Sequence, residues 1–184
     1  MEPLESKNKT LRIAITGPEC SGKTYLTEHL AKYYEGCWVP EVAREFLPAL
    51  GRKYQFDDLL VLSRLQLAEE KKIEKNCNAN VIFYDTELIN IKIWSEYRFG
   101  KVHEEIIRNI QKSTYDFYFL MYPDIPWEYD PLRENPDDRL ELFEQFENEL
   151  KQFGKTYHII QGGLHQRIHD ALYWIEKFEN TPTN

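Results

Sequence analysis

The stretch Leu11-Arg12-Ile13-Ala14-Ile15-Thr16 runs directly into Gly17-Pro18-Glu19-Cys20-Ser21-Gly22-Lys23-Thr24. The first part is an apolar run that predicts a buried strand. The second has the form G-x-x-x-x-G-K-T, a phosphate-binding loop that opens a helix. Its two glycines let the main chain bend so that successive N–H groups point at an anion, and the helix N-terminus adds partial positive charge. The pattern therefore predicts a nucleotide phosphate site at the end of the first strand.

The polar groups of this loop have expected roles in such a site. Lys23 can reach the β- and γ-phosphates of ATP and act as a catalytic cation, and the Thr24 hydroxyl can bind Mg²⁺. The residues expected to contact the nucleotide are Gly17, Pro18, Glu19, Cys20, Ser21, Gly22, Lys23, Thr24 and Tyr25. The alternative interpretation is a glycine-rich turn that binds no nucleotide.

Length and composition favour a single globular domain over residues 1–184. The chain has 184 residues, 42% of them hydrophobic, and a formal net charge of −8; a chain of this size can bury a full core. An acidic surface repels polyanions, so we expect no nucleic-acid partner. No apolar stretch approaches the length of a membrane span, and residues 1–10 lack the apolar core of a leader. We therefore expect no membrane association.

The cysteines, Cys20, Cys37 and Cys77, are odd in number and include no C-x-x-C pair. We therefore expect neither a disulfide nor a zinc site, and a location in the reducing cytoplasm. Cys20 lies near a helix N-terminus, which can lower the pKa of a thiol, although the loop also tolerates any small residue there. The histidines, at positions 29, 103, 158, 165 and 169, show no metal-ligand spacing. His165 and His169 share one helix face, but no carboxylate or cysteine set completes a site there, and both are expected on the surface.

Apolar runs alternate with helical patterns along the chain. Strands are expected at residues 11–16, 37–40, 81–85, 117–121 and 157–160. Helices are expected at about 21–36, 57–75, 86–99, 102–110, from Asn135 onward with Pro136 in the first turn, and at 164–178. This alternation requires a parallel sheet covered by helices on both faces, the α/β class. Ligands of such sheets bind beyond the carboxyl ends of the strands, so polar residues that follow a strand are the candidates for function.

Three side chains after the second and third strands are candidates for phosphoryl transfer. That reaction needs Mg²⁺, cations and a carboxylate that accepts a hydroxyl proton. Asp85 ends an apolar run, in the form of a Walker B carboxylate, and can bind Mg²⁺ or a substrate hydroxyl; the alternative is a helix N-terminal acid. Glu41 is a candidate base or sugar ligand, or else a solvated surface acid. Arg44 can contact phosphate, or it can simply pair with Glu41.

The proline-rich segment after the fourth strand, residues 123–139, is expected to be a lid over the site. Arg133 and Arg139 are its candidate catalytic cations, which would close over the triphosphate. The alternative is that both arginines pair with nearby acids on a wet surface. Trp127 can stack on a planar ring of the substrate, or it can pin the segment to the core.

Several motifs together resemble the ribosylnicotinamide kinase domain of NadR-type proteins. They are the phosphate loop, Glu41-x-x-Arg44-Glu45-Phe46, Tyr84-Asp85-Thr86, Tyr97-x-x-Gly100-Lys101, and Asp130-Pro131-Leu132-Arg133 before an amphipathic helix. The likeness covers about residues 11–178. The phosphate loop is specific only to a superfamily, whereas the E-x-x-R-E-F and D-T elements narrow the resemblance. It makes Asp130, at the entry of the lid, a candidate substrate ligand beside Glu41 and Asp85.

The resemblance implies a five-stranded parallel sheet in the strand order 2-3-1-4-5, with helices on both sides. It also implies ATP and Mg²⁺, and transfer of the γ-phosphate to the 5′-hydroxyl of nicotinamide riboside, which gives nicotinamide mononucleotide. The expected partner is a small nucleoside-like substrate, and a homo-oligomer is an option. NadR-type proteins usually carry this domain after a DNA-binding and an adenylyltransferase module, which are not recognisable here. Another nucleoside or a small hydroxylated metabolite therefore stays an alternative acceptor.

Two other functions are compatible with the loop. One is a regulatory NTPase or nucleotide-dependent switch, and the other is a nucleotide-binding module without chemistry. The sequence has no Asn-Lys-x-Asp guanine-reading motif and no D-x-x-G switch, and it lacks room for the helical lid domain of ring ATPases. These features favour the kinase.

Overall fold

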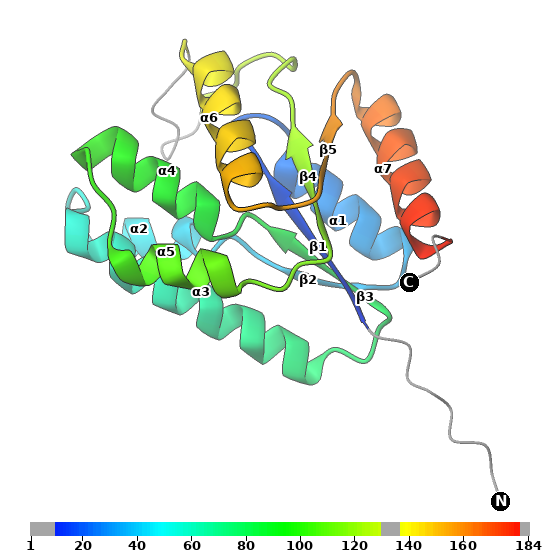
Figure 1. The fold of residues 1–184 in the computed structure, drawn as a ribbon, viewed down its shortest axis with the longest axis horizontal. Coiled ribbons are helices and arrows are strands. Elements are labelled where there is room, and N and C mark those ends of the chain that lie inside the picture. Colours follow the sequence, from blue (N-terminus) through cyan, green and yellow to red (C-terminus); the bar gives the residue numbers. More distant parts are fainter. Residues whose placement is uncertain (1–9, 130–136, 181–184) are drawn as a thin grey trace, which may run out of the picture.

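The computed structural model describes residues 10–129 and 137–180. The elements in chain order are β1 (Leu11–Thr16), α1 (Lys23–Tyr33), β2 (Cys37–Val39), α2 (Ala43–Ala49), α3 (Phe56–Asn76), β3 (Val81–Asp85), α4 (Leu88–Phe99), α5 (Glu104–Lys112), β4 (Phe117–Met121), α6 (Arg139–Gln152), β5 (Tyr157–Ile160) and α7 (Leu164–Glu179). The five strands form one parallel sheet in the order β2-β3-β1-β4-β5 (Figure 1). The α/β class and the strand order implied by the resemblance are both confirmed.

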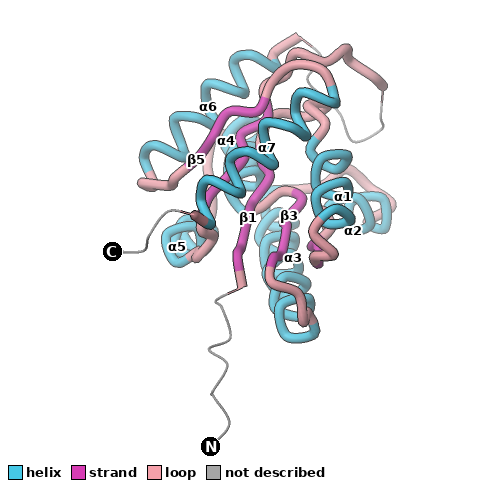
Figure 2. The backbone as a smooth tube through the Cα atoms, turned by 90° about the vertical axis from the view of Figure 1, so that its right-hand side faces the viewer, coloured by secondary structure: helices cyan, strands magenta, loops and turns pink. Residues whose placement is uncertain are grey.

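Helices cover the sheet on both faces, so the strands are apolar on both sides. Ile13 and Ile15 of β1 pack with α1 and α7, whereas Ala14 between them belongs to the core beneath α2–α6. Figures 1 and 2 show the sheet lying between these two groups of helices. The expected strands all form, because a continuous apolar run is the pattern of a strand that is buried on both faces.

One helix begins later than the sequence predicts. The helix expected from Thr86 begins at Leu88, because Thr86 has a φ of 68° and cannot continue a right-handed helix. Glu87 then caps the first turn by accepting a hydrogen bond from the N–H of Ile89 at 2.7 Å. The helix start predicted at Asn135 and Pro136 lies outside the described residues, and α6 begins at Arg139.

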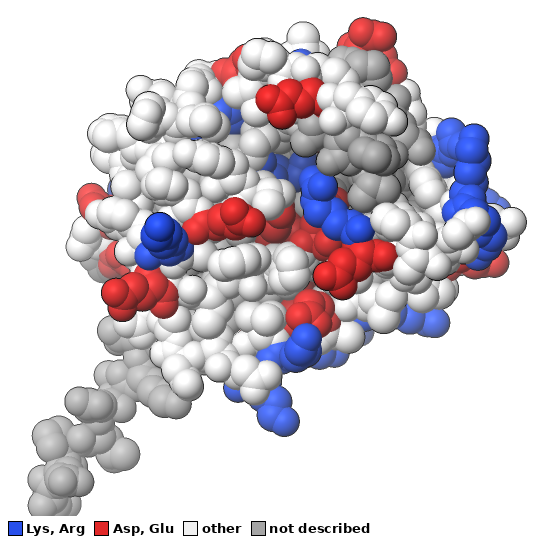
Figure 3. Space-filling model, turned by 180° about the vertical axis from the view of Figure 1, so that it is seen from behind, with Lys and Arg blue, Asp and Glu red and all other residues white. Residues whose placement is uncertain are grey.

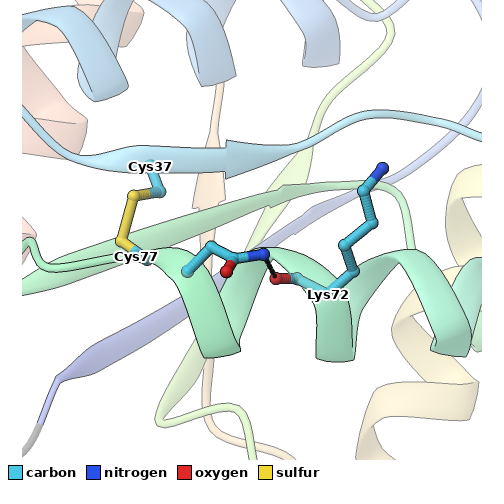
Figure 4. Close-up of a disulfide and its surroundings, with 4 residues drawn as sticks. Cys37, Lys72 and Cys77 are labelled. Carbon is cyan, nitrogen blue, oxygen red and sulfur yellow. Dashed lines mark hydrogen bonds between the residues drawn. A yellow bond between two sulfur atoms is a disulfide. The ribbon is translucent and has the colours of Figure 1, made fainter.

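The expectation that the chain forms no disulfide is wrong. Cys37 at the start of β2 is bonded to Cys77, which follows α3, and their Cα atoms are 6.1 Å apart (Figure 4). The odd number of cysteines misled the prediction, because the third cysteine, Cys20, takes no part in the disulfide. A separation of 40 residues carries no local signal of pairing. Packing of α3 against β2 brings the two thiols together.

His165 and His169 are exposed, as the sequence predicts, and His29 is exposed as well. The ring of His158 on β5 stacks on Trp174 with centroids 3.8 Å apart, and the ring of His103 stacks on Phe56 at 4.0 Å. Both of these histidines are half-buried.

Candidate active site

The phosphate loop leaves β1 in a conformation that only glycine can adopt at its first position. Gly17 has a φ of 133°, and a Cβ there would lie 2.8 Å from the backbone oxygen of Met121. The first residue of the loop therefore passes directly over the end of β4. A side chain would force the loop away from the sheet and away from the strand ends where ligands of such folds bind.

The rest of the loop curls around a central space. Cys20 and Gly22 have positive φ angles of 53° and 83°. When left-handed and right-handed backbone conformations alternate in this way, successive N–H groups point inward and form an anion-binding nest. The Ser21 hydroxyl donates to the oxygen of Pro18 at 2.7 Å, which holds the turn closed. The backbone geometry is thus that of a phosphate cradle at the N-terminus of α1.

Lys23 is folded back over this cradle. Its ammonium donates to the oxygens of Gly17 at 2.9 Å and Pro18 at 2.8 Å. Burial lowers the pKa of Lys23, while the nearby carboxylates of Glu41 and Asp85 act in the opposite direction. A polyanion in the cradle would offer the ammonium stronger acceptors than the two carbonyl groups do.

Asp85 meets Thr24 at the end of β3. The Thr24 hydroxyl donates to Oδ2 of Asp85 at 2.6 Å, and within the described part of the chain no group donates to the buried Oδ1. Burial raises the pKa of Asp85 to about 6, with a further contribution from the charge of Glu41. A buried carboxylate oxygen without a donor, beside a threonine hydroxyl, fits the oxygen ligands that Mg²⁺ prefers.

Residues 10–129 and 137–180 include no cluster of three or more His, Cys, Asp or Glu side chains that could hold a metal ion. An Mg²⁺ ion at this place would therefore depend on Thr24, Asp85, phosphate oxygens and water, which is the usual pattern for this cation.

Glu41 and Arg44 belong to the segment that follows β2. Glu41 stands in the turn between β2 and α2, and its Oε2 is 3.1 Å from Nε of Arg44. Both side chains line the same cavity as Lys23 and Thr24. The ion pair that the sequence offered as an alternative does form, and it forms at the wall of the site.

A cavity of about 730 Å³, within the range of small-molecule sites, lies against Lys23, Thr24, Glu41 and Arg44, whereas Asp85 lies behind Thr24 and is not part of the lining. Its lining consists of Glu19, Cys20, Ser21, Gly22, Lys23, Thr24, Tyr25, Glu41, Arg44, Asn90, Trp94, Ile125, Pro126, Glu128 and Leu164. Two of these, Asn90 and Trp94 on α4, were missed by the sequence reasoning. The two residues lie in the helix that follows Asp85 and are four positions apart, which puts them on one helix face. This spacing was the signal in the sequence that could have identified them.

The segment after β4 is attached to the phosphate loop through Arg139. Its guanidinium donates to the oxygens of Ile125 at 2.9 Å and Cys20 at 3.3 Å, and lies 5.7 Å from the centre of the Trp127 ring. Trp127 is not among the residues that line the cavity, and its ring lies beside the Arg139 guanidinium. The other two lid candidates, Asp130 and Arg133, lie outside the described residues.

Arg167 on α7 is a further residue that the sequence reasoning missed. It is 1% exposed, and it donates to the oxygens of Ser21 at 3.0 Å, Gly162 at 2.7 Å and Tyr122 at 2.8 Å. It also forms an ion pair with Asp124. One buried side chain therefore joins the phosphate loop to the loops that follow β4 and β5.

Two further features are the distribution of charge on the surface and the length and polarity of the helices. On the face drawn in Figure 3, acidic and basic side chains lie interspersed. Over residues 10–129 and 137–180, every helix is too short or too polar to cross a bilayer.

Comparison with known proteins supports the reading of the fold. A protein-family model described as an AAA domain matches residues 12–167. No curated protein matches the chain at a significant level. A solved structure of NadR protein in complex with NR has a TM-score of 0.80 at 19% identity, and the match covers 97% of this chain and 53% of that one. The chain therefore spans about half the length of NadR.

Nucleoside and nucleotide kinases match over nearly their whole length. Deoxyadenosine kinase from M. mycoides with bound dATP has a TM-score of 0.63 at 14% identity, and the match covers 90% of this chain and 99% of that one. Thymidylate kinase from Ehrlichia chaffeensis has a TM-score of 0.63 at 13% identity, with 91% and 99% covered. Since these identities are low, the likenesses establish a shared fold. The family match over residues 12–167 goes further, and the chain belongs to the AAA-domain family of phosphate-loop proteins.

Proposed function

We propose that the protein is an ATP- and Mg²⁺-dependent kinase that phosphorylates the 5′-hydroxyl of a nucleoside, with nicotinamide riboside as the acceptor. The observation that carries the proposal is the arrangement around the cavity. Thr24 donates to Asp85 beside the phosphate loop, and Glu41 lines the same cavity as Lys23 and Thr24. A triphosphate in the loop and an alcohol near Glu41 would share one enclosed space.

The residues divide the work of phosphoryl transfer. Lys23 would leave its two carbonyl acceptors and bind the β- and γ-phosphate oxygens, where it stabilises the charge of the transition state. Thr24 and Asp85 would hold Mg²⁺, which would neutralise the charge of the phosphates. Asp85 is thereby committed to the metal, and Glu41 is left as the base.

The transfer step is a direct displacement. The Glu41 carboxylate accepts the proton of the 5′-hydroxyl, and the oxygen forms a bond to the γ-phosphorus. The bond between that phosphorus and the β–γ bridging oxygen breaks, and ADP leaves. The products are the nucleoside monophosphate and ADP, and the proton on Glu41 passes to water.

The acceptor side of the cavity suits a planar cation. Trp94 offers an aromatic face and Asn90 offers an amide next to it, with Glu41 and Glu128 in the same lining. The pyridinium ring of nicotinamide riboside is flat and positively charged, and such a ring is attracted to an indole face and to carboxylates. The fold likeness to NadR bound to NR supports the same choice.

Steady-state turnover tests the proposal. The purified full chain is given Mg²⁺ and ATP with nicotinamide riboside, deoxyadenosine, thymidine or no acceptor, and ADP release and the phosphorylated product are measured. We expect ADP release to require the acceptor. We also expect Lys23→Ala to slow turnover about 100-fold or more. The control is Lys32→Ala at the other end of α1, which removes an exposed lysine.

The results separate the alternatives. ATP hydrolysis that no acceptor stimulates would favour the regulatory NTPase, and nucleotide binding without any turnover would favour a binding module. Phosphorylation of a different acceptor would retain the kinase and replace its substrate. The cytoplasmic location and a homo-oligomer stay predictions, and the Cys37–Cys77 disulfide removes the cysteine argument for the former.

A further inference from the structure

The turn that carries Glu41 is held by a single side chain. Only Pro40, Glu41 and Val42 separate β2 from α2. The N–H of Val42 donates to Oε1 of Gln66 at 3.0 Å, and Nε2 of Gln66 donates to the oxygen of Pro40 at 3.3 Å. The side-chain amide of Gln66 is therefore hydrogen-bonded to the main chain on both sides of Glu41.

The orientation of this amide follows from its partners. Val42 offers a donor and needs an oxygen opposite it, whereas Pro40 offers a carbonyl and needs an N–H. Gln66 lies in α3 and is 2% exposed. A buried amide is costly unless both of its ends are hydrogen-bonded. The amide oxygen and the amide nitrogen of Gln66 both find their hydrogen-bond partners on the same short turn. These two bonds restrict the conformation of the turn and of the side chain.

Gln66 also touches the acceptor side of the site. It lines a small cavity together with Glu41, Thr86, Asn90 and Trp94, and three of these residues also line the large cavity. The side chain thus stands between the turn that carries the candidate base and the helix that carries Trp94. A shift of the turn would change the distance between Glu41 and an acceptor hydroxyl.

From these contacts we infer that Gln66 is a positioning residue for Glu41. It sets the carboxylate at the distance from the acceptor hydroxyl that proton transfer requires. The inference rests on the proposed kinase function. It assigns no contact of Gln66 with the substrate, because both ends of its amide are already used by the main chain.

The test variant is Gln66→Met, which keeps the length of the side chain and removes both hydrogen bonds. The control is Tyr115→Phe. Tyr115 donates to Oε1 of the buried Glu70 at 3.0 Å, and Glu70 lies one helical turn after Gln66 on α3. Both variants lose a buried polar contact of the same helix, and the contact of the control lies outside both cavities.

Two measurements are made on both variants and the unmodified chain. In the kinase assay we expect Gln66→Met to lower kcat by about 100-fold while KM for ATP stays within roughly twofold, because a misplacement of about 1 Å has that effect on chemistry alone. In native-state hydrogen exchange we expect the Val42 amide to exchange about tenfold faster or more in the variant. Tyr115→Phe should change neither.

Each outcome decides something. Unchanged kcat and unchanged Val42 exchange would overturn the inference. Equal loss of kcat in Gln66→Met and Tyr115→Phe would reduce Gln66 to a general stabiliser of α3, and the positioning role would fall. Inactivity of the unmodified chain toward every acceptor would refute the kinase proposal and the positioning role with it. The hydrogen-exchange rate of the Val42 amide, compared between Gln66→Met and the unmodified chain, would still show whether Gln66 stabilises the turn.

Discussion

The hydroxyl of Thr24 donates to Oδ2 of Asp85 across 2.6 Å, which joins the first turn of α1 to the end of β3. The two residues are 61 positions apart in the chain. Their contact places the hydroxyl of the phosphate loop beside a buried carboxylate. Oδ1 of that carboxylate has no donor within the described residues, which is why we propose this pair as the ligands of Mg²⁺.

The ionisation of Asp85 predicts a pH dependence for the binding of Mg²⁺ and ATP. Its pKa is raised by burial to about 6, above the usual value of about 4. The folded protein therefore keeps the Asp85 proton up to about pH 6, and the neutral acid is a poor ligand for Mg²⁺. We expect titration calorimetry to show affinity that is constant above pH 7 and falls as the pH drops through about 6.

The raised pKa of Asp85 also predicts how the free energy of unfolding depends on pH. A raised carboxyl pKa means that the folded state binds more protons than the unfolded state between about pH 4 and 6, so this contribution declines as pH rises through that window. Asp85→Asn should remove the decline and also weaken Mg²⁺ binding. An Mg²⁺–ATP affinity that stays the same from pH 5 to 7 would contradict the assignment of Asp85 as the metal ligand.

Trp94 is predicted to bind the ring of the acceptor. Trp94→Ala should raise KM for nicotinamide riboside about tenfold, because it removes an aromatic face worth roughly 1 kcal/mol or more. KM for ATP should not change. Trp38→Ala, which removes an exposed tryptophan of the edge strand β2, is the matched control. Equal effects on both substrates would place the acceptor elsewhere.

Arg167 is predicted to stabilise both the fold and the ATP site. Arg167→Met removes a buried guanidinium that bonds three carbonyl oxygens and Asp124. Since removal of one partner of a buried ion pair costs about 3–5 kcal/mol, urea denaturation should show a loss of that order.

KM for ATP should also rise in Arg167→Met, because Ser21 loses its anchor. Arg167→Lys should not restore either property, since a lysine ammonium cannot reproduce the planar fork of an arginine. A stability loss with an unchanged KM for ATP would show that the loop keeps its shape without this contact.

The disulfide is predicted to contribute to stability by closing a 40-residue segment. Cys37→Ser should lower the free energy of unfolding by about 2–4 kcal/mol, because the unfolded chain regains the freedom that the crosslink removed. Addition of a reductant should destabilise the unmodified chain by a similar amount and leave the variant as it is. If the reductant affects neither protein, the bond does not form in solution.

The sequence alone predicted the elements whose signals are local. Apolar runs of four to six residues fixed the strands, and alternation of strands with helices predicted a parallel sheet with two covered faces. The phosphate loop was recognisable because its glycines and its lysine act within eight consecutive residues. Asp85 was found by the same means, since it directly ends an apolar run. The order of the strands came from the resemblance to a known family, and the structure confirmed it.

Contacts between distant parts of the chain were beyond such patterns. Nothing in the sequence near Gln66 indicates that it contacts the turn around Glu41. Arg167 looks like an ordinary charged residue of an amphipathic helix, and the sequence does not indicate its contact with the phosphate loop. The same holds for the bond between Cys37 and Cys77 and for the contact of Trp127 with Arg139.

Short-range backbone and hydrophobic preferences decided what each segment of this protein becomes, and they act over a few residues, so the sequence by itself contains them. Which polar side chains meet depends on the packing of whole helices against the sheet. The tertiary structure alone therefore decided that Gln66 of α3 holds the turn around Glu41, that Arg167 of α7 holds the phosphate loop, and that Asn90 and Trp94 line the same cavity as that loop.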